Sequence, residues 1–299
     1  CQKINLLKSV NISLKAVPSK TTMPILECIL IDATTNQIKF TTNDMELGIE
    51  TIVDGTIEEK GIIALDAKIF YEIIRRLPDN TVTIKTDEKL TATITCEKAK
   101  FTIPGKSGDD FAYLPVIERG EGIEISQFTL KEVIRQTIFS IAANENNKMM
   151  TGELFEVKGD MLRVVSLDGH RISIRKIELK EEYSDIKVVV PGKTLFEVLK
   201  LLKDSEGEVE ICPSRRHILF RIDNYTVISA LLEGEFLDYK SALPKDKKTE
   251  VTVSTRTMIE SVERVSLLIT DRLKSPVRCV IGEDTVKLFC TTTMGRPPQ

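Results

Sequence analysis

The spacing of apolar residues predicts five amphipathic helices, at residues 3–16, 66–77, 129–143, 193–203 and 255–269. In each segment, apolar side chains recur at intervals of three or four residues, which places them on one helix face. Between the helices the sequence alternates apolar and polar residues. Residues 81–103 do so across two strands and a turn, which is typical of an antiparallel sheet with one exposed face. The pattern predicts an α+β fold.

The same order of elements is written more than once along the chain. The segment from Gly61 to Pro115 matches the segment from Lys187 to Pro244, each as a short strand, a helix, a charged turn and further strands. A second half-unit recurs from Cys28, from Gly152 and from Val277. The two closing prolines lie 129 residues apart, so whole domains repeat, rather than the shorter units of a solenoid.

These repeats divide the chain into three predicted domains, at residues 1–116, 123–244 and 249–299. The third is expected to be incomplete, because it holds only the first half of the repeat. The first is expected to lack its opening strand, since a strand precedes the helix in the other half-units. The linkers at residues 116–122 and 245–250 are short, which favours domains that pack side by side.

The composition argues against a membrane-spanning protein and against a cysteine-based metal site. Hydrophobic residues make up 41% of the 299 residues, enough for two or three ordinary cores. No apolar run approaches the roughly 20 residues that a bilayer span requires. The six cysteines are scattered and form no Cys-x-x-Cys pair, so we expect reduced thiols buried in the cores and no metal site.

The charge is small overall but unevenly distributed. The net charge is −3, which argues against a nucleic-acid binder. The predicted helices and their immediate flanks, however, hold 15 Lys and Arg against 10 Asp and Glu. A positive helical layer with a negative remainder would attract phosphates to one face. Ordinary solvated helix faces would give the same counts, so the distribution alone leaves both interpretations open.

Two short motifs suggest catalysis and fail on inspection. The run from Pro191 to Thr194 lacks the first glycine of a phosphate-binding loop, because position 187 is Lys187. We therefore expect a plain helix start there, with Thr194 near the cap. The run from Asp168 to Arg171 combines an acid, a histidine and a cation, but a tight turn in which Gly169 adopts positive φ explains it better.

Four motifs, taken together and in order, resemble one family. These are the run from Lys20 to Leu26, the turn from Asn43 to Leu47, the turn from Asp168 to Arg171, and the run from Phe236 to Tyr239. They are similar to the bacterial sliding clamp, the β subunit of DNA polymerase III. The resemblance extends from residue 1 to about residue 295.

The resemblance implies repeated clamp domains, each with two helices against curved antiparallel sheets, that form part of a ring. Family members are head-to-tail homodimers whose helices line a central hole through which duplex DNA passes without sequence readout. They are non-catalytic cytoplasmic subunits that need no cofactor. They bind the replicative polymerase, the clamp loader and other proteins through short peptide motifs.

The resemblance also implies roles for individual residues. The expected DNA-facing residues are Lys8, Lys15, Lys20, Arg75, Arg76, Lys131, Arg135, Lys148, Lys200, Lys203 and Arg264. The expected peptide-binding cleft comprises Met150, Leu167, Gly169, His170, Arg171, Ile172, Leu237, Ser241 and Ala242. The expected dimer interface comprises Phe101, Ile103, Leu267 and Leu268, although their spacing would also suit ordinary core positions.

Two other functions remain open from the residues alone. One is a hydrolase that uses His170 with a nearby acid. The other is a repeat-built scaffold that binds proteins but never encircles DNA.

Overall fold

The computed structural model of the chain describes residues 1–112, 114–115, 122–143, 147–244, 246, 248–267, 269 and 275–291. It divides into two compact units, Cys1–Tyr239 and Lys240–Gln299. The helices are α1 (Lys3–Ser13), α2 (Ala67–Arg76), α3 (Gln127–Thr137), α4 (Gly192–Leu201), α5 (Tyr239–Ala242) and α6 (Thr255–Ser266). Short 3-10 turns follow α1 and α3 and span Pro24–Glu27, Gly108–Asp110 and Lys148–Thr151. The five helices predicted from periodicity are confirmed, although α3 begins two residues earlier than expected and all five end one to six residues earlier.

The strands of the first half of the chain are β1 (Cys28–Asp32), β2 (Ile38–Asn43), β3 (Leu47–Val53), β4 (Ile62–Asp66), β5 (Thr83–Thr86), β6 (Thr91–Cys96), β7 (Ala99–Lys106) and β8 (Ile123–Ser126). The later strands are β9 (Gly152–Leu167), β10 (Ile172–Pro191), β11 (Glu208–Pro213), β12 (His217–Ile222), β13 (Tyr225–Ala230), β14 (Arg278–Ile281) and β15 (Val286–Phe289). All of the strand pairs within the described residues are antiparallel, as expected for the α+β class.

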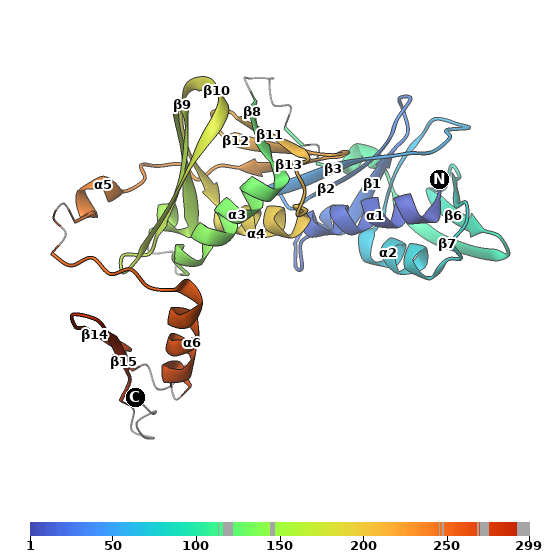
Figure 1. Cartoon of the computed structure of the whole chain (residues 1–299). Coiled ribbons are helices and arrows are strands. Elements are labelled where there is room, and N and C mark those ends of the chain that lie inside the picture. Colours follow the sequence, from blue (N-terminus) through green and yellow to red (C-terminus); the bar gives the residue numbers. More distant parts are fainter. Residues whose placement is uncertain are drawn as a thin grey trace. The chain divides into compact units, whose positions relative to one another are not determined.

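One sheet runs through most of the unit Cys1–Tyr239 (Figure 1). Among the described residues it has eleven strands, in the order β5-β6-β7-β4-β1-β2-β3-β13-β12-β11-β8. The predicted first and second domains meet edge to edge where β3 pairs with β13, from Leu47↔Ser229 to Thr51↔Tyr225. Backbone hydrogen bonds therefore join the two repeats directly.

The strand registers repeat in the two halves of this unit. In the first, β1 pairs with β4 from Cys28↔Asp66 onward, immediately before α2. In the second, the first half of β9 pairs with the end of β10 from Gly152↔Pro191, immediately before α4. The strands β9 and β10 are much longer than the short strands expected from the sequence. Gly159, at positive φ, occupies the position in β9 that corresponds to the turn between β1 and β2 in the first repeat. The chain continues through Gly159 as one strand.

Two cores hold the helices against the sheet. One gathers Leu6, Phe40, Phe70 and Ile74, each of which is no more than 1% exposed. The other gathers residues of α3, α4 and β8–β13, and it also includes Ile12 and Leu47 from the first repeat. Because the second core draws on both repeats, the first two predicted domains are packed into one compact unit.

Local chemistry explains where the helices begin. The Asp66 carboxylate accepts a hydrogen bond from the Ile69 backbone at 2.8 Å and caps α2, and the Ser126 hydroxyl accepts one from Thr129 at 3.2 Å and caps α3. Helix α4 follows Pro191 without a side-chain cap. Thr194, which we expected near that cap, is buried, with its hydroxyl 2.6 Å from the Ser229 hydroxyl. Burial against β13 thus draws this side chain away from the helix end.

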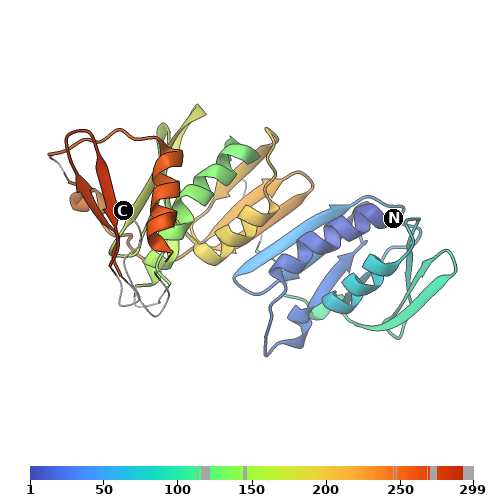
Figure 2. The same ribbon diagram turned by 60° about the horizontal axis from the view of Figure 1, so that its bottom comes forward.

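The unit Lys240–Gln299 holds α6 and the β14–β15 hairpin. Val265 and Cys290 are buried in it, whereas Val280 and Ile281 on β14 are about half exposed, at 51% and 50%. No helix among the described residues is both long enough and apolar enough to cross a membrane. Figure 2 shows the same elements from a second direction.

Candidate functional site: a helical face, a clamped turn and an apolar cluster

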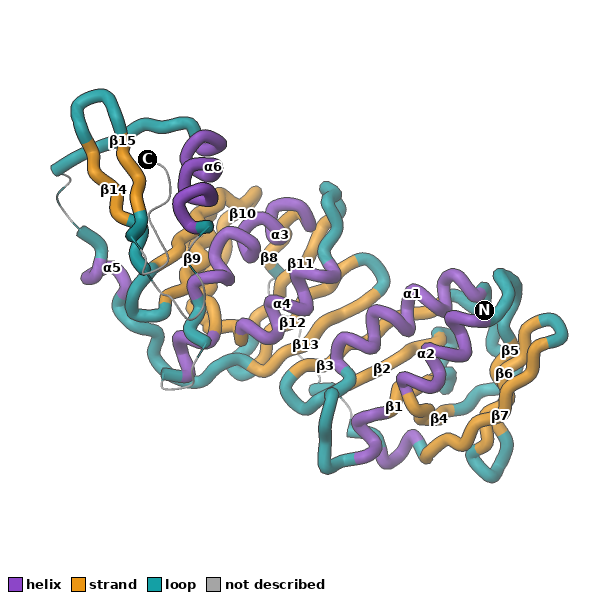
Figure 3. The backbone as a smooth tube through the Cα atoms, turned by 90° about the horizontal axis from the view of Figure 1, so that it is seen from below, coloured by secondary structure: helices purple, strands orange, loops and turns teal. Residues whose placement is uncertain are grey.

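Helices α1 to α4 lie on one face of the sheet in the unit Cys1–Tyr239 (Figure 3). Their apolar sides pack into the two cores, so their polar sides form an exposed surface, which we call the helical face. The expected DNA-facing cations Lys8, Arg75, Arg76, Arg135 and Lys200 are exposed on these helices.

Most of the arginines and several lysines of this face are paired with carboxylates. Glu72 binds both Arg75 and Arg76, at 2.9 and 3.0 Å. The Arg75 hydrogen bond holds the pKa of the Glu72 carboxyl below its usual value. Further pairs are Arg135–Glu132 at 2.7 Å, Lys131–Asp204 at 2.8 Å, Lys200–Glu197 at 2.7 Å and Lys203–Asp223 at 2.5 Å. The excess of positive charge counted from the sequence is therefore partly neutralised within the surface.

Four of the expected DNA-facing lysines form no ion pair within the described part of the chain. They are Lys8, Lys15, Lys20 and Lys148. Lys15 is half-buried, and the other three are exposed. In the second unit, Arg264 of α6 donates a hydrogen bond to the Ser261 hydroxyl at 3.0 Å. The unpaired lysines have ammonium groups available to an incoming phosphate.

The turn at residues 168–171 is built on one carboxylate. Asp168 Oδ1 accepts backbone hydrogen bonds from His170 and Arg171 at 3.1 and 3.2 Å, and Gly169 adopts φ +88°. The bond from His170 is the main reason that the pKa of Asp168 is lowered. Asp44 holds the matching turn of the first repeat in the same way, with bonds of 3.0 and 2.7 Å from Glu46 and Leu47. Met45, at φ +77°, occupies the position of Gly169, which confirms that the two turns correspond.

This geometry indicates a structural role for His170. Its backbone binds Asp168, and its side chain is exposed. The run from Pro191 to Thr194 also has a structural role. Lys193 Nζ lies 2.5 Å from Asp44 Oδ2, and this ion pair connects α4 to the first repeat. Within the described residues, no group of three or more His, Cys, Asp or Glu side chains could hold a metal ion.

Arg171 is held on two sides. Its Nε donates to Asp168 Oδ2 at 3.0 Å, and its guanidinium lies 5.8 Å from the centre of the Phe139 ring. Phe139 is 57% exposed, so the ring and the guanidinium form a surface feature. Phe139 was not among the predicted site residues, because residue spacing gives no sign that a residue 32 positions earlier lies beside Arg171.

Three of the expected cleft residues lie in one apolar cluster. Leu167 is buried there with Phe236 and Tyr239, and the half-buried Met150 and Ile172 pack against them. We call this set the apolar cluster.

The other expected cleft residues lie near its margin or in the second unit. Leu237, which follows Phe236 in the chain, is 45% exposed. Gly169 is exposed in the turn that joins Leu167 to Ile172. Ser241 and Ala242 are exposed and belong to the second unit.

The expected dimer contacts are surface residues where the structure describes them. Phe101 and Ile103 lie on β7; Phe101 is 40% exposed, and Ile103 is half-buried against the first core. Leu267, directly after α6, is 78% exposed, and Leu268 lies outside the described residues. Phe101 and Leu267 are therefore not ordinary core residues of this chain.

A buried carboxyl group, that of Glu153, was not predicted from the sequence. Glu153 on β9 is fully buried, and neither of its carboxyl oxygens has a hydrogen-bond partner among the described residues. The nearby Thr137 hydroxyl donates instead to the backbone oxygens of Val133 and Ile134. Loss of solvation raises the pKa of Glu153 to about 8.

Comparison with known proteins places this architecture in a family. Residues 1–115 match the model of the DNA polymerase III beta subunit N-terminal domain, and residues 124–238 match that of its central domain. The beta sliding clamp of Bacillus subtilis is 37% identical over 276 residues, which cover 89% of this chain and 73% of that protein. That of Staphylococcus epidermidis is 32% identical over 294 residues, covering 96% of this chain and 78% of that one.

Solved structures agree with the sequence matches. The crystal structure of a protein from Eubacterium rectale assigned as a DNA polymerase III beta subunit matches with a TM-score of 0.96 and 57% identity, over 99% of this chain and 81% of that one. The sliding clamp of Bacillus subtilis matches with a TM-score of 0.88 and 34% identity, over 96% and 82%. On these matches, the chain belongs to the DNA polymerase III beta subunit family, the bacterial beta sliding clamps.

Proposed function

We propose that this sliding clamp acts as a processivity factor that encircles duplex DNA without reading its sequence and tethers the replicative polymerase. The observation that carries the proposal is the helical face, where α1 to α4 present Lys8 and other cations on one side of a continuous sheet. In a closed ring of such units, the helices would face the DNA and the sheet would form the outer wall. We propose domains at residues 1–116, 123–244 and 249–299; the family matches over residues 1–115 and 124–238 support the first two.

The balance of charge on the helical face suits sliding. A ring stays on DNA by topology, so its phosphate contacts need only be weak and exchangeable. Exposed ion pairs such as Arg75–Glu72 are weak, so these cations can exchange a carboxylate for a phosphate, with the lost ion pair offsetting part of the gain. A polymerase held by a peptide on the ring would stay at high local concentration.

The apolar cluster and the clamped turn form the proposed peptide-binding cleft. Leu167, Ile172 and Met150 would receive apolar side chains, and the guanidinium of Arg171 would bind a carbonyl or a carboxylate of the peptide. A Pseudomonas aeruginosa clamp, 26% identical with a TM-score of 0.89, has been solved with griselimycin bound. We propose that this chain also binds griselimycin, through its own apolar cluster.

We propose that the chain is a non-catalytic, cytoplasmic subunit. His170 is exposed in a turn that its backbone helps to build, and this arrangement favours a structural part over the hydrolase alternative. A scaffold that binds proteins but never encircles DNA is the remaining rival, and a topological experiment separates it from a clamp.

That experiment loads the full-length chain onto nicked circular plasmid with a clamp loader and ATP, and follows retention at about 0.5 M salt, where exposed charges are strongly screened. A clamp is retained on the circle and is lost when a restriction enzyme linearises the plasmid. A scaffold is lost from both forms alike, and that result would reject the proposal.

The unpaired lysines are expected to carry more of the DNA affinity than the paired arginines. Replacing Lys8, Lys20 and Lys148 together with alanine should reduce the slope of log K against log salt by up to about 0.9 per lysine. The measurement is fluorescence anisotropy with a labelled duplex of about 30 base pairs. The matched control replaces Arg75, Arg76 and Arg135, which already bind Glu72 and Glu132. A larger loss in the control would show that the ion pairs do not matter.

Phe139 is expected to position Arg171 for the peptide. Phe139→Leu removes the ring face beneath the guanidinium and should weaken griselimycin binding about three- to tenfold, since cation–π contacts at exposed sites are worth about 0.5–1 kcal/mol and Arg171 would also lose order. Phe139→Tyr keeps the ring and should bind as the parent does. Isothermal titration measures both variants. Equal weakening by the two substitutions would contradict this role.

A further inference from the structure

We propose that a second pocket, which shares Phe236 with the apolar cluster, binds a short acidic peptide segment with one apolar side chain between two carboxylates. The pocket has a volume of about 530 Å³, within the 300–1,000 Å³ typical of ligand sites. It lies between β10, the turn before β12 and residues 231–236. None of the nine cleft residues expected from the sequence lines it.

Backbone hydrogen bonds fix the walls of this pocket. Leu231 N donates to Arg216 O at 2.8 Å, and Leu232 N donates to Val189 O at 3.0 Å. Residues 231–232 therefore bridge the turn before β12 and the strand β10. Gly234, at φ +143°, then lets the segment continue past the side chain of Met149. Because these hydrogen bonds already order the walls, binding of a ligand would cost little conformational entropy there.

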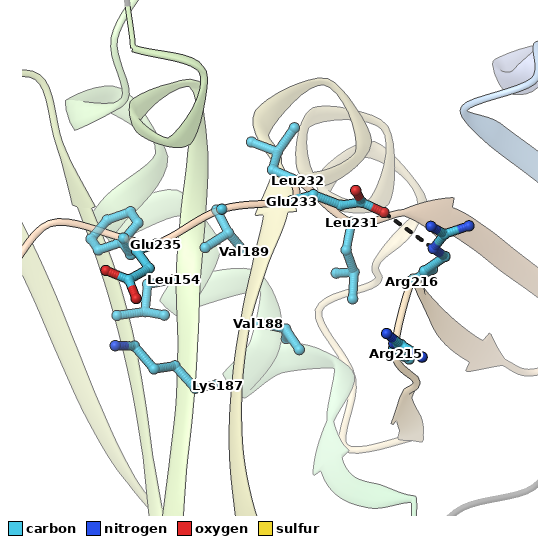
Figure 4. A pocket seen from close by; sticks show the side chains of 12 residues that line it. Leu154, Lys187, Val188, Val189, Arg215, Arg216, Leu231, Leu232, Glu233 and Glu235 are labelled. Atoms are coloured by element: carbon cyan, nitrogen blue, oxygen red, sulfur yellow. Dashed lines mark ion pairs between the residues drawn. The ribbon is translucent and has the colours of Figure 1, made fainter.

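The floor of the pocket is apolar, and the cations Lys187 and Arg215 lie on opposite sides of it (Figure 4). In Figure 4, Val188 lies between Lys187 on one side and Arg215 on the other. Both cations are exposed, and neither forms an ion pair within the described residues. A single phosphate would need cations that converge on one point. Two separated cations across an apolar floor instead fit two carboxylates with an apolar side chain between them.

The acidic pocket residues Glu233 and Glu235 determine whether Lys187 or Arg215 binds a carboxylate more strongly. Glu233 is engaged by Arg216 at 3.2 Å, so this pair adds little net charge. Glu235 lines the same side as Lys187 and offsets its charge (Figure 4). Arg215 has no such neighbour among the pocket residues and therefore offers the stronger site for a carboxylate.

The test uses a fluorescein-labelled heptapeptide, Ser-Glu-Glu-Leu-Glu-Glu-Ser, and its lysine counterpart, in which lysine replaces each glutamate, with the full-length chain. Reversing both cations in Lys187→Glu with Arg215→Glu should raise the Kd of the acidic peptide at least about tenfold and favour the lysine peptide instead. Arg215→Glu alone should have a larger effect than Lys187→Glu alone. Lys158→Glu, an exposed lysine elsewhere on β9, is the matched control and should change the Kd less than about twofold.

Several results would overturn the proposal. These are no saturable binding of the acidic peptide up to about 1 mM, an equal effect of the control reversal, and displacement of the peptide by saturating griselimycin, which would place it in the cleft. Displacement by inorganic phosphate at matched ionic strength would make the pocket a phosphate site. Circular dichroism checks that each variant is folded, and the three positions are exposed, so their reversal should leave the cores intact.

Discussion

Replacing Glu153 with methionine is expected to stabilise the protein strongly, by about 4 kcal/mol at pH 8. The carboxyl is fully buried with no hydrogen-bond partner in the part of the chain that the structure describes, and its pKa is raised from 4.5 to about 8. The folded protein therefore keeps the carboxyl protonated at neutral pH, whereas the unfolded chain releases that proton readily. Each pH unit between these two values favours unfolding by about 1.36 kcal/mol.

The sign of the pH dependence follows from the raised pKa. Below about pH 4.5 the carboxyl is protonated in both the folded and the unfolded state, so its titration does not affect stability. As the pH rises, the free-energy cost of keeping the proton in the folded state grows, and this cost levels off above about pH 8. Calorimetry should show Glu153→Met melting about 10 °C above the parent at pH 8, with a smaller gain at pH 5. Glu156→Met in the same strand is the control and should destabilise, because it removes the partner of Arg163 at 3.3 Å. Equal gains at both pH values would show that Glu153 does not titrate in this range.

Replacing Phe101 with aspartate is expected to shift the full-length protein from dimer to monomer. Phe101 is 40% exposed on β7, and burying such a side chain against a partner contributes about 1.5–3 kcal/mol. A head-to-tail dimer would contain this contact twice, so the dissociation constant should rise by about 10²- to 10⁴-fold.

Sedimentation velocity over a range of protein concentrations measures this shift. Phe196→Asp on α4 is the control, since that phenylalanine is similarly exposed, at 44%, but lies on the helical face. The interface assignment fails if Phe101→Asp sediments as the parent does, or if both variants dissociate alike. A dimer lost only in Phe101→Asp would identify β7 as one side of the contact.

Much of the local structure was predictable because it depends on neighbours in the sequence. The helix at 66–77 was predicted from its apolar spacing, and the capping bond from Ile69 to Asp66 begins it within one residue of the expected position. The turn at residues 168–171 was predicted from Gly169, whose positive φ the structure confirms. The lengths of β9 and β10 were not predictable, because the sequence at Gly159 reads as a turn and the chain passes through it as a strand.

The candidate site was predictable only in part. The resemblance located Arg171 and Leu167, but the ring of Phe139 beside Arg171 depends on how α3 packs against β9 and β10. The charge count left a basic helical face and ordinary solvated helices both open, and it did not show that Lys131 binds Asp204, a residue 73 positions away. Pairing of this kind depends on the spatial meeting of two helix ends.

The sequence by itself determined the repeat, the positions of the helices, the two matching turns and the family, because each rests on residues close together in the chain or on motifs in a fixed order. Only the tertiary structure decided that β3 pairs with β13 to join two repeats in one sheet, that Glu153 is buried with no hydrogen-bond partner within the described residues, and that Lys187 and Arg215 flank a common pocket. Each of these depends on contacts between segments distant in sequence, which form only when strands align in register and cores close.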